Sequence, residues 1–80
     1  MSEEITKVEQ TRYRHIHFEV IEEKAKAKVW ECRNNKTGAR LGEISWYGPW
    51  RKYCICLWVG CVFDDGCLDD ISHFLKQLRR

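Results

Sequence analysis

The fold is decided by the stretch LGEISWYGPWRKYCICLWV, residues 41–59. Within it, residues 41–46 and 51–59 both have the extended, apolar-rich pattern of β-strands. Gly48 and Pro49 form a tight reversal between them, because proline has no amide hydrogen for a strand ladder and keeps the preceding residue extended. The stretch therefore predicts two antiparallel neighbours in a β-meander.

Two further strands are expected upstream. In residues 13–20 apolar and polar side chains alternate, which indicates a half-buried strand that ends before the acidic pair Glu22-Glu23. Residues 24–30 alternate Lys with Ala or Val. Ala and Lys also favour helices, but apolar residues two positions apart cannot cover one helical face, so this segment is predicted to be a strand. Residues 34–38, rich in Asn and ending in Gly, are predicted to form the next turn.

The chain changes to a helical period after Gly60. An apolar stripe with spacings of three and four residues is made by Leu68, Ile71, Leu75 and Leu78, with Phe74 beside it. Asp64-Asp65-Gly66 offers an N-cap, and the first turn is acidic and the last turn basic, as the helix dipole favours. We therefore predict one C-terminal helix, residues 67–78, packed on one face of a three- to four-stranded antiparallel sheet. This is an α+β fold.

The length of 80 residues fits one domain. We expect residues 13–80 to form this domain, and the mostly polar residues 1–12 to be a flexible leader. The longest apolar run, Cys54–Phe63, is much shorter than the roughly 20 residues of a membrane-spanning helix. The N-terminus is acidic and lacks the pattern of a signal peptide. The sequence therefore predicts no membrane association and a cytoplasmic location.

Neither catalysis nor metal binding is indicated. The five cysteines are an odd number without a signal peptide, so they are expected to be reduced. They lack the CxxC pairs of structural zinc sites, although Cys54, Cys56, Cys61 and His73 remain an alternative zinc set. No nucleophile elbow, phosphate loop or metalloprotease motif occurs. We expect a non-enzymatic protein with no catalytic residues, no metal and no cofactor.

The net charge of +2 conceals an uneven distribution. Residues 24–52 hold eight Lys and Arg against two Glu, a net charge of +6, whereas residues 53–75 hold four Asp and no Lys or Arg. A basic stretch on a nearly neutral chain indicates an acidic partner. The lysines also have a structural explanation, because edge strands often carry Lys that prevents aggregation.

The alternation of the last strand predicts its two faces. One parity holds Arg51, Tyr53, Ile55 and Leu57, and the other holds Trp50, Lys52, Cys54 and Cys56. The apolar end of the first set fits the face covered by the helix, and the second set fits the open face. The aromatic corner around Pro49 is either a hydrophobic plug for the end of the sheet or a recognition surface.

The same corner carries a family resemblance. Residues 42–54 contain the pattern GxIxWYxPWRxYC, with Val29-Trp30-Glu31 upstream and Val62-Phe63 downstream. In these features the chain resembles a small uncharacterised family of proteins from bacteriophages, prophages and related mobile elements, over roughly residues 25–78. It departs from that family after Cys54, where relatives continue with Phe-Phe-Pro. The resemblance implies a viral protein in the cytoplasm of a host cell, and it implies no established activity.

Two functions are expected from the charge distribution, the aromatic corner and the resemblance. The first is nucleic-acid binding through a basic, Trp-containing surface of sheet and hairpin. The alternative is a protein-binding accessory factor, an inhibitor or modulator of a host or viral complex, with the Trp-rich corner as its hot spot. The residues expected to bind nucleic acid or the partner are Lys26, Lys28, Arg33, Lys36, Arg40, Trp50, Arg51 and Lys52. Monomer and homodimer are both compatible with the sequence.

Overall fold

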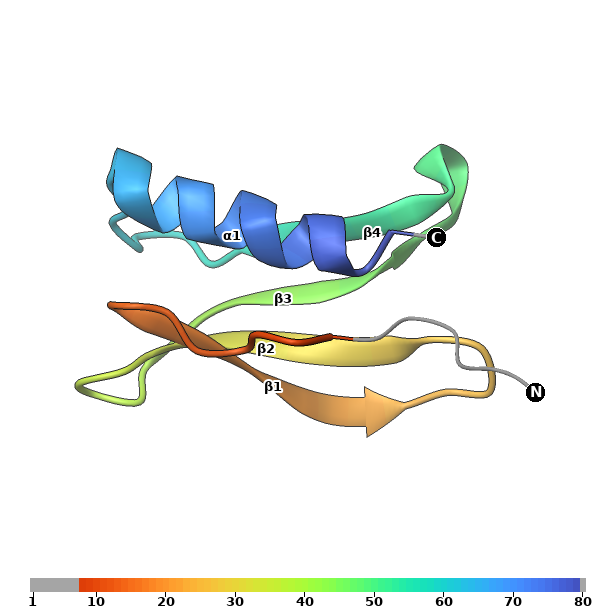
Figure 1. Cartoon of the computed structure of the whole chain (residues 1–80), viewed down its shortest axis with the longest axis horizontal. Coiled ribbons are helices and arrows are strands. Elements are labelled where there is room, and N and C mark those ends of the chain that lie inside the picture. The colour runs from red at the N-terminus through yellow and green to blue at the C-terminus, as the bar shows by residue number, and fades with distance from the viewer. Residues whose placement is uncertain (1–7, 80) are drawn as a thin grey trace.

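The computed structural model describes residues 8–79, which form one antiparallel sheet and one helix (Figure 1). The elements in chain order are β1 (Ile16–Glu23), β2 (Lys28–Asn34), β3 (Arg40–Tyr47), the 3₁₀ turn η1 (Gly48–Trp50), β4 (Lys52–Leu57) and α1 (Asp65–Gln77). The four strands lie in sequence order, and each is antiparallel to the next. The predicted α+β fold is confirmed, with four strands.

The register of the strands decides which side chains meet the helix. Trp30, Ile44 and Ile55 lie opposite one another on β2, β3 and β4. All three belong to the core under α1 or pack against it. Because side chains alternate along a strand, Cys54 and Cys56 lie on the other side, which we call the open face. Residues 53–57 of β4 therefore have the two faces that the sequence predicted, whereas Lys52, expected on the open face, lines a groove beside α1.

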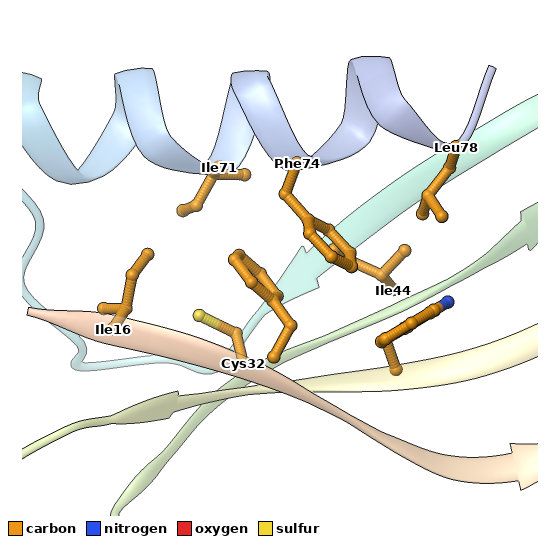
Figure 2. Close-up of a cluster of buried hydrophobic side chains, with 8 residues drawn as sticks. Ile16, Cys32, Ile44, Ile71, Phe74 and Leu78 are labelled. Carbon is orange, nitrogen blue, oxygen red and sulfur yellow. The ribbon is translucent and has the colours of Figure 1, made fainter. Parts of the chain in front are cut away.

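The core is centred on Phe74, which is completely buried in α1. Its ring stacks on Phe18 of β1 at a centroid distance of 4.0 Å and meets Trp30 of β2 edge to face at 5.0 Å. Figure 2 shows Ile71, Phe74 and Leu78 pointing from α1 toward the sheet. Aromatic rings bury large areas, which suits a domain this small because its core holds few residues.

Helix α1 begins earlier than predicted, and its buried stripe is narrower. Asp64 is the N-cap, and its carboxylate accepts a hydrogen bond from the Cys67 amide at 2.8 Å. This bond holds the pKa of Asp64 below its ordinary value. The prediction that Leu68 packs on the sheet is wrong, because its side chain is 50% exposed. At 100° per residue Leu68 lies about 120° around the helix from Phe74, which places it at the margin of the stripe.

The first hairpin also differs from the prediction. Strand β1 continues through Glu23, past a bulge in its register with β2. Strand β2 begins at Lys28 rather than at Lys24, and the residues between the strands form a turn in which the Lys24 amide donates to the Ala27 carbonyl at 2.8 Å. Ala and Lys are poor strand formers, and this segment has no large apolar side chain to anchor it on the sheet. The lysines at positions 24, 26 and 28 therefore do not share one strand face.

Residues 9 and 10 of the expected leader are hydrogen-bonded to the helix. The backbone amides of Glu9 and Gln10 donate to the side-chain oxygen of Gln77 at 2.9 and 3.0 Å. The Gln77 side-chain amide donates in return to the Gln10 carbonyl at 2.8 Å. Residues 1–7 of the expected leader lie outside the described residues.

Gly42 is expected to be intolerant of substitution. It is buried in β3, and a Cβ atom there would lie 2.7 Å from the carbonyl oxygen of Cys56 on β4. Gly42→Ala should therefore destabilise the protein by about 1–3 kcal/mol, as overpacking does, and lower the thermal midpoint. Gly48→Ala is the matched control, because a Cβ atom there meets nothing within 4 Å. Equal midpoints for the two variants would contradict the close approach of β3 and β4.

Candidate functional site: a basic and aromatic groove

A groove lies between α1 and the beginning of β4. Its volume is about 460 Å³, which is within the usual range of ligand pockets. The α1–β4 groove, as we call it, is lined by Trp46, Arg51, Lys52, Tyr53, Leu68, Ile71, Ser72, Leu75, Lys76, Leu78 and Arg79. These residues come from the end of β3, the reversal, β4 and one side of α1.

One side of α1 forms the helical wall of the groove. Ser72, Leu75 and Lys76 are three or four residues apart, so they lie on one side of the helix, and Arg79 follows just past its C-terminal end. Leu75 packs against the core and Leu68 is half exposed, which gives this wall an apolar base beneath a basic rim. Residues 9 and 10 are hydrogen-bonded to the C-terminal end of α1 through Gln77, outside the set of residues that line the groove.

The reversal between β3 and β4 forms the opposite wall. Arg51 has a left-handed backbone with φ of 55°, and its amide donates to the carbonyls of Tyr47 and Gly48 at 2.9 and 3.1 Å. A left-handed conformation costs a non-glycine residue on the order of 1 kcal/mol. The hydrogen bonds and the fixed φ of Pro49 offset this cost. The turn thereby places Arg51 and Lys52 at the groove.

Four cations line the groove, namely Arg51, Lys52, Lys76 and Arg79. None of the residues that line it is an Asp or a Glu. Within residues 8–79 the four cations form no ion pairs, since the ion pairs there involve other side chains. Like charges around a concave surface raise the local positive potential and attract anions.

Aromatic rings lie in the groove and beside it. Trp46 is 44% exposed and meets Tyr53 edge to face at 5.5 Å. Outside the groove, Trp50 is 65% exposed and meets Tyr47 edge to face at 5.2 Å. The aromatic corner is therefore a solvent-exposed surface rather than a buried plug, and exposure is what recognition by stacking requires.

The open face of the sheet carries carboxylates that neutralise its arginines. Glu31 is only 3% exposed. Arg33 contacts it through Nη2 at 2.7 Å and Nε at 2.9 Å, and Arg40 approaches it at 3.5 Å. Glu19 and Glu43 occupy the paired positions on the neighbouring strands, so three carboxylates lie in a row across this face. Arg33 and Arg40 are therefore already engaged within the fold.

A histidine adds to the polar network at the edge of this face. His17 Nε2 lies 2.7 Å from a Glu19 carboxylate oxygen, and His17 Nδ1 lies 2.7 Å from the side-chain oxygen of Asn35. The hydrogen bond from His17 lowers the pKa of Glu19 below its ordinary value. This network ties β1 to the turn after β2 and leaves Glu19 negatively charged at neutral pH.

The structure separates the eight predicted binding residues into two groups at opposite ends of the sheet (Figure 1). The group at the end where α1 finishes is Lys26, Lys28, Trp50, Arg51 and Lys52. The group at the end where α1 begins is Arg33, Lys36 and Arg40. The first group is connected to the groove, because the Lys28 amide donates to the Tyr53 hydroxyl at 3.3 Å.

Of the residues that line the groove, only Arg51 and Lys52 were among the predicted binding residues. The aromatic and charged residues that the prediction missed are Trp46, Tyr53, Lys76 and Arg79. A signal for Lys76 was present, because its spacing places it on the same side of the helix as Ser72, and Arg79 adds a second cation just past the helix end. The sequence pattern does not reveal which strand that side faces. The sequence therefore showed the positive charges of Lys76 and Arg79, but it did not show that they line the same groove as Trp46.

Burial makes two of the five thiols less reactive. All five cysteines are free. Burial raises the pKa of Cys32 to about 12, and burial also raises the pKa of Cys67. Both thiols are therefore protonated at neutral pH and are weak nucleophiles. Residues 8–79 contain no group of three or more His, Cys, Asp or Glu placed to hold a metal ion.

In the described part of the chain, no helix has the length and apolar character needed to cross a membrane.

The chain is similar to a protein of a bacterial virus. It is 40% identical over 45 residues to the "Uncharacterized 9.3 kDa protein" of Acholeplasma phage L2. The match covers 55% of this chain and 58% of the phage protein, so the chain spans little more than half the length of that relative. No family model and no solved structure matches the chain. The similarity supports the expected relation to phage proteins, and the motif at residues 42–54 stays a prediction.

Proposed function

We propose that the protein is a non-enzymatic module that binds single-stranded nucleic acid in the α1–β4 groove, in the cytoplasm of a phage-infected cell. The observation that carries this proposal is the meeting of four cations with the exposed Trp46 and the partly buried Tyr53 around one groove. Lys and Arg neutralise phosphates, and bases stack on aromatic side chains.

Electrostatics favours the groove over the open face of the sheet. On the open face, a phosphate would have to compete with Glu31 for Arg33 and Arg40. It would also meet the charges of Glu19 and Glu43 on either side. The groove has no carboxylate among its lining residues, so an anion meets no such competition there.

Shape favours a single strand over a duplex. The rings of Trp46 and Tyr53 lie inside a groove of about 460 Å³, bounded by α1 on one side and the reversal on the other. A base reaches such a ring only when it is unstacked, as in single strands and loops. Lys26 and Lys28 lie at the same end of the sheet, where Lys28 pairs in register with Glu23 of β1.

The composition of the groove supports a binding role rather than a catalytic one. Its lining residues include no His, Cys, Asp or Glu. These are the side chains that most often act as general bases or metal ligands. Ser72 and the Tyr53 hydroxyl lie there without such a base among the lining residues.

The test is a double charge reversal at the groove, Lys52→Glu with Lys76→Glu. Affinity for labelled oligo-dT, oligo-U and a duplex of equal length would be measured at several salt concentrations. The wild type should bind the single strands more tightly than the duplex, with an affinity that falls steeply with salt. The variant should bind at least about tenfold more weakly, with a log–log salt slope shallower by about 2, because two phosphate contacts are lost.

The matched control is Arg14→Glu with Lys36→Glu, which changes the net charge by the same amount away from the groove. It should bind like the wild type, and it also tests the predicted role of Lys36. Equal weakening of both variants would mean that only net charge matters. If the wild type bound no oligonucleotide even at low salt, the proposal would be wrong.

A protein partner is the second candidate, and the exposure of Trp50 favours it. This side chain is 65% exposed beside Tyr47 and does not line the groove. Trp is the residue type most enriched at interface hot spots. Trp50→Ala separates the candidates: it should leave oligonucleotide affinity nearly unchanged if the groove binds the strand, and a protein partner seated on this corner should lose most of its affinity.

A further inference from the structure

The two edges of the sheet differ in how they are protected. The β1 edge is covered, because the Phe18 amide donates to the Thr11 carbonyl at 2.8 Å and Arg12 forms a β-bridge with His17. Strand β1 also has a bulge and ends in two glutamates. Covering segments, bulges and charged side chains are the means by which edge strands avoid pairing with other chains.

Strand β4 is the other edge, and it has none of these protections. Its six residues pair with β3 in an unbroken register. They include no proline and a single charged side chain, Lys52 at the start. A regular, apolar edge strand of this kind favours pairing with another strand.

The backbone groups of β4 that point away from β3 can be identified. Just past β4, the Trp58 amide donates to the carbonyl of Leu41 in β3 at 2.9 Å. Hydrogen-bonding direction alternates along a strand, so every second residue before Trp58 also faces β3. The residues whose backbone groups point outward are Tyr53, Ile55 and Leu57. Within residues 8–79 these outward groups have no hydrogen-bond partner.

We propose that β4 pairs in an antiparallel manner with β4 of a second copy of this chain, with the two Ile55 residues opposite each other. In this register Tyr53 of each copy lies opposite Leu57 of the other, so all the outward backbone groups are used. A shift by two residues in one direction would bring in Arg51, whose left-handed backbone cannot continue a strand. A shift in the other direction would bring in Val59, which lies in a turn.

The side chains fit this register. Lys52 falls opposite Trp58 of the second copy, so the two lysines do not face each other. Leu57 and Trp58 are 41% and 40% exposed in the single chain, and pairing covers part of their apolar surface. The interface therefore joins apolar surface without opposing like charges.

The register also brings thiols together. Cys54 lies opposite Cys56 of the second copy, and this is a non-hydrogen-bonded pair with Cα atoms about 4.5 Å apart. A disulfide bond needs a Cα separation of about 4.4–6.8 Å. Both side chains project from the open face. Formation of a disulfide bond between Cys54 of one copy and Cys56 of the other would therefore identify this register.

Antiparallel pairing about a two-fold axis perpendicular to the sheet places both helices on the same face. The result is a continuous sheet of two copies, with both α1–β4 grooves opening on that face. The proposed pairing depends on the backbone hydrogen-bonding groups of β4 and not on the cations of the groove. It can therefore be correct even if the proposed function is wrong, and the reverse also holds.

The first test uses thiol complementation in a chain that carries Cys61→Ser and Cys67→Ser. Copper phenanthroline removes two electrons and two protons from each opposed pair of thiols, and a disulfide bond forms. This chain should give a covalent dimer. Adding Cys54→Ser or Cys56→Ser should prevent the cross-link, and an equimolar mixture of those two proteins should restore it as a heterodimer. Cross-linking of either single variant as fast as the mixture would overturn the proposed register.

The second test measures the non-covalent assembly by analytical ultracentrifugation. The wild type under reducing conditions should sediment as a dimer at high concentration. Cys54→Lys with Cys56→Lys places like charges opposite each other and should give a folded monomer, as checked by circular dichroism. Cys54→Lys with Cys56→Glu places opposite charges there and should restore the dimer. A wild type that is monomeric at every concentration would overturn the proposal, whatever the fate of the variants.

Discussion

An Ile71→Asp variant is expected to be unfolded at room temperature. Ile71 is 4% exposed on the face of α1 that meets the sheet. Aspartate there would remove apolar packing and leave a charge with no partner in the core, which costs several kcal/mol, roughly the whole stability of a small domain. Circular dichroism should show loss of the native spectrum, and thermal scans should show no cooperative transition.

The matched control is Leu68→Asp, the same kind of substitution one turn earlier on the same helix. Leu68 is half exposed, so the new carboxylate remains in water. It also lies in the first turn of α1, where a negative charge interacts favourably with the helix dipole. This variant should fold with a nearly native thermal midpoint. A native spectrum for Ile71→Asp, or unfolding of both variants, would contradict the placement of the helix.

A Glu31→Ala variant is expected to lose about 3 kcal/mol of stability. Glu31 is almost completely buried on the open face between Arg33 and Arg40. Removing one partner of a buried ion pair typically costs about 3–5 kcal/mol, because the other charge is left without compensation. We expect a loss at the lower end of that range, because the Arg33 side chain is 33% exposed and its charge is partly solvated. Urea unfolding followed by tryptophan fluorescence would measure the loss.

Two further variants separate the ion pair from other effects. Glu19→Ala removes a carboxylate from the paired position on β1, where the side chain is 51% exposed, so the loss should be much smaller. Glu31→Ala combined with Arg33→Ala should recover part of the stability, because no unpaired guanidinium remains. Equal losses for Glu19→Ala and Glu31→Ala would show that burial of Glu31 contributes nothing.

Alternation and capping made the architecture predictable from the sequence. The parity of residues 51–57 distinguished the two faces of β4, because large apolar side chains occupied one parity only. Asp64 was recognisable as the N-cap, since its short carboxylate precedes an apolar helical stripe. These features are local in the sequence, so they can be recognised without knowledge of the tertiary structure.

The failures have a common physical cause. In residues 24–27 the alternation of Lys and Ala imitated a strand, but small side chains gain little from packing on a sheet. Leu68 belonged to the apolar spacing, yet its side chain is half exposed beside the groove. Burial of Glu31 depends on arginines from two strands, which come together only after the strands have paired. The spacing of apolar residues predicts which side of a helix or strand is buried, but it does not predict how far the opposing surface extends.

The candidate site was predictable in part for the same reason. The cations at residues 51 and 52 and the exposed Trp50 were found in the sequence because they are contiguous. The other two cations of the groove, Lys76 and Arg79, come more than twenty residues later in the chain. No spacing rule connects Lys76 with Trp46, and only the packing angle of the helix on the sheet brings them together.

Residues 11 and 12 cover the β1 edge of the sheet, so only the β4 edge is left for pairing with another copy of the chain. A protomer with one available edge can add one neighbour, and growth then stops. A protomer with two available edges can add neighbours without limit and seeds fibres. If β4 pairs as proposed, the segment on β1 limits assembly to two copies, and removing it would leave both edges of each copy available for pairing.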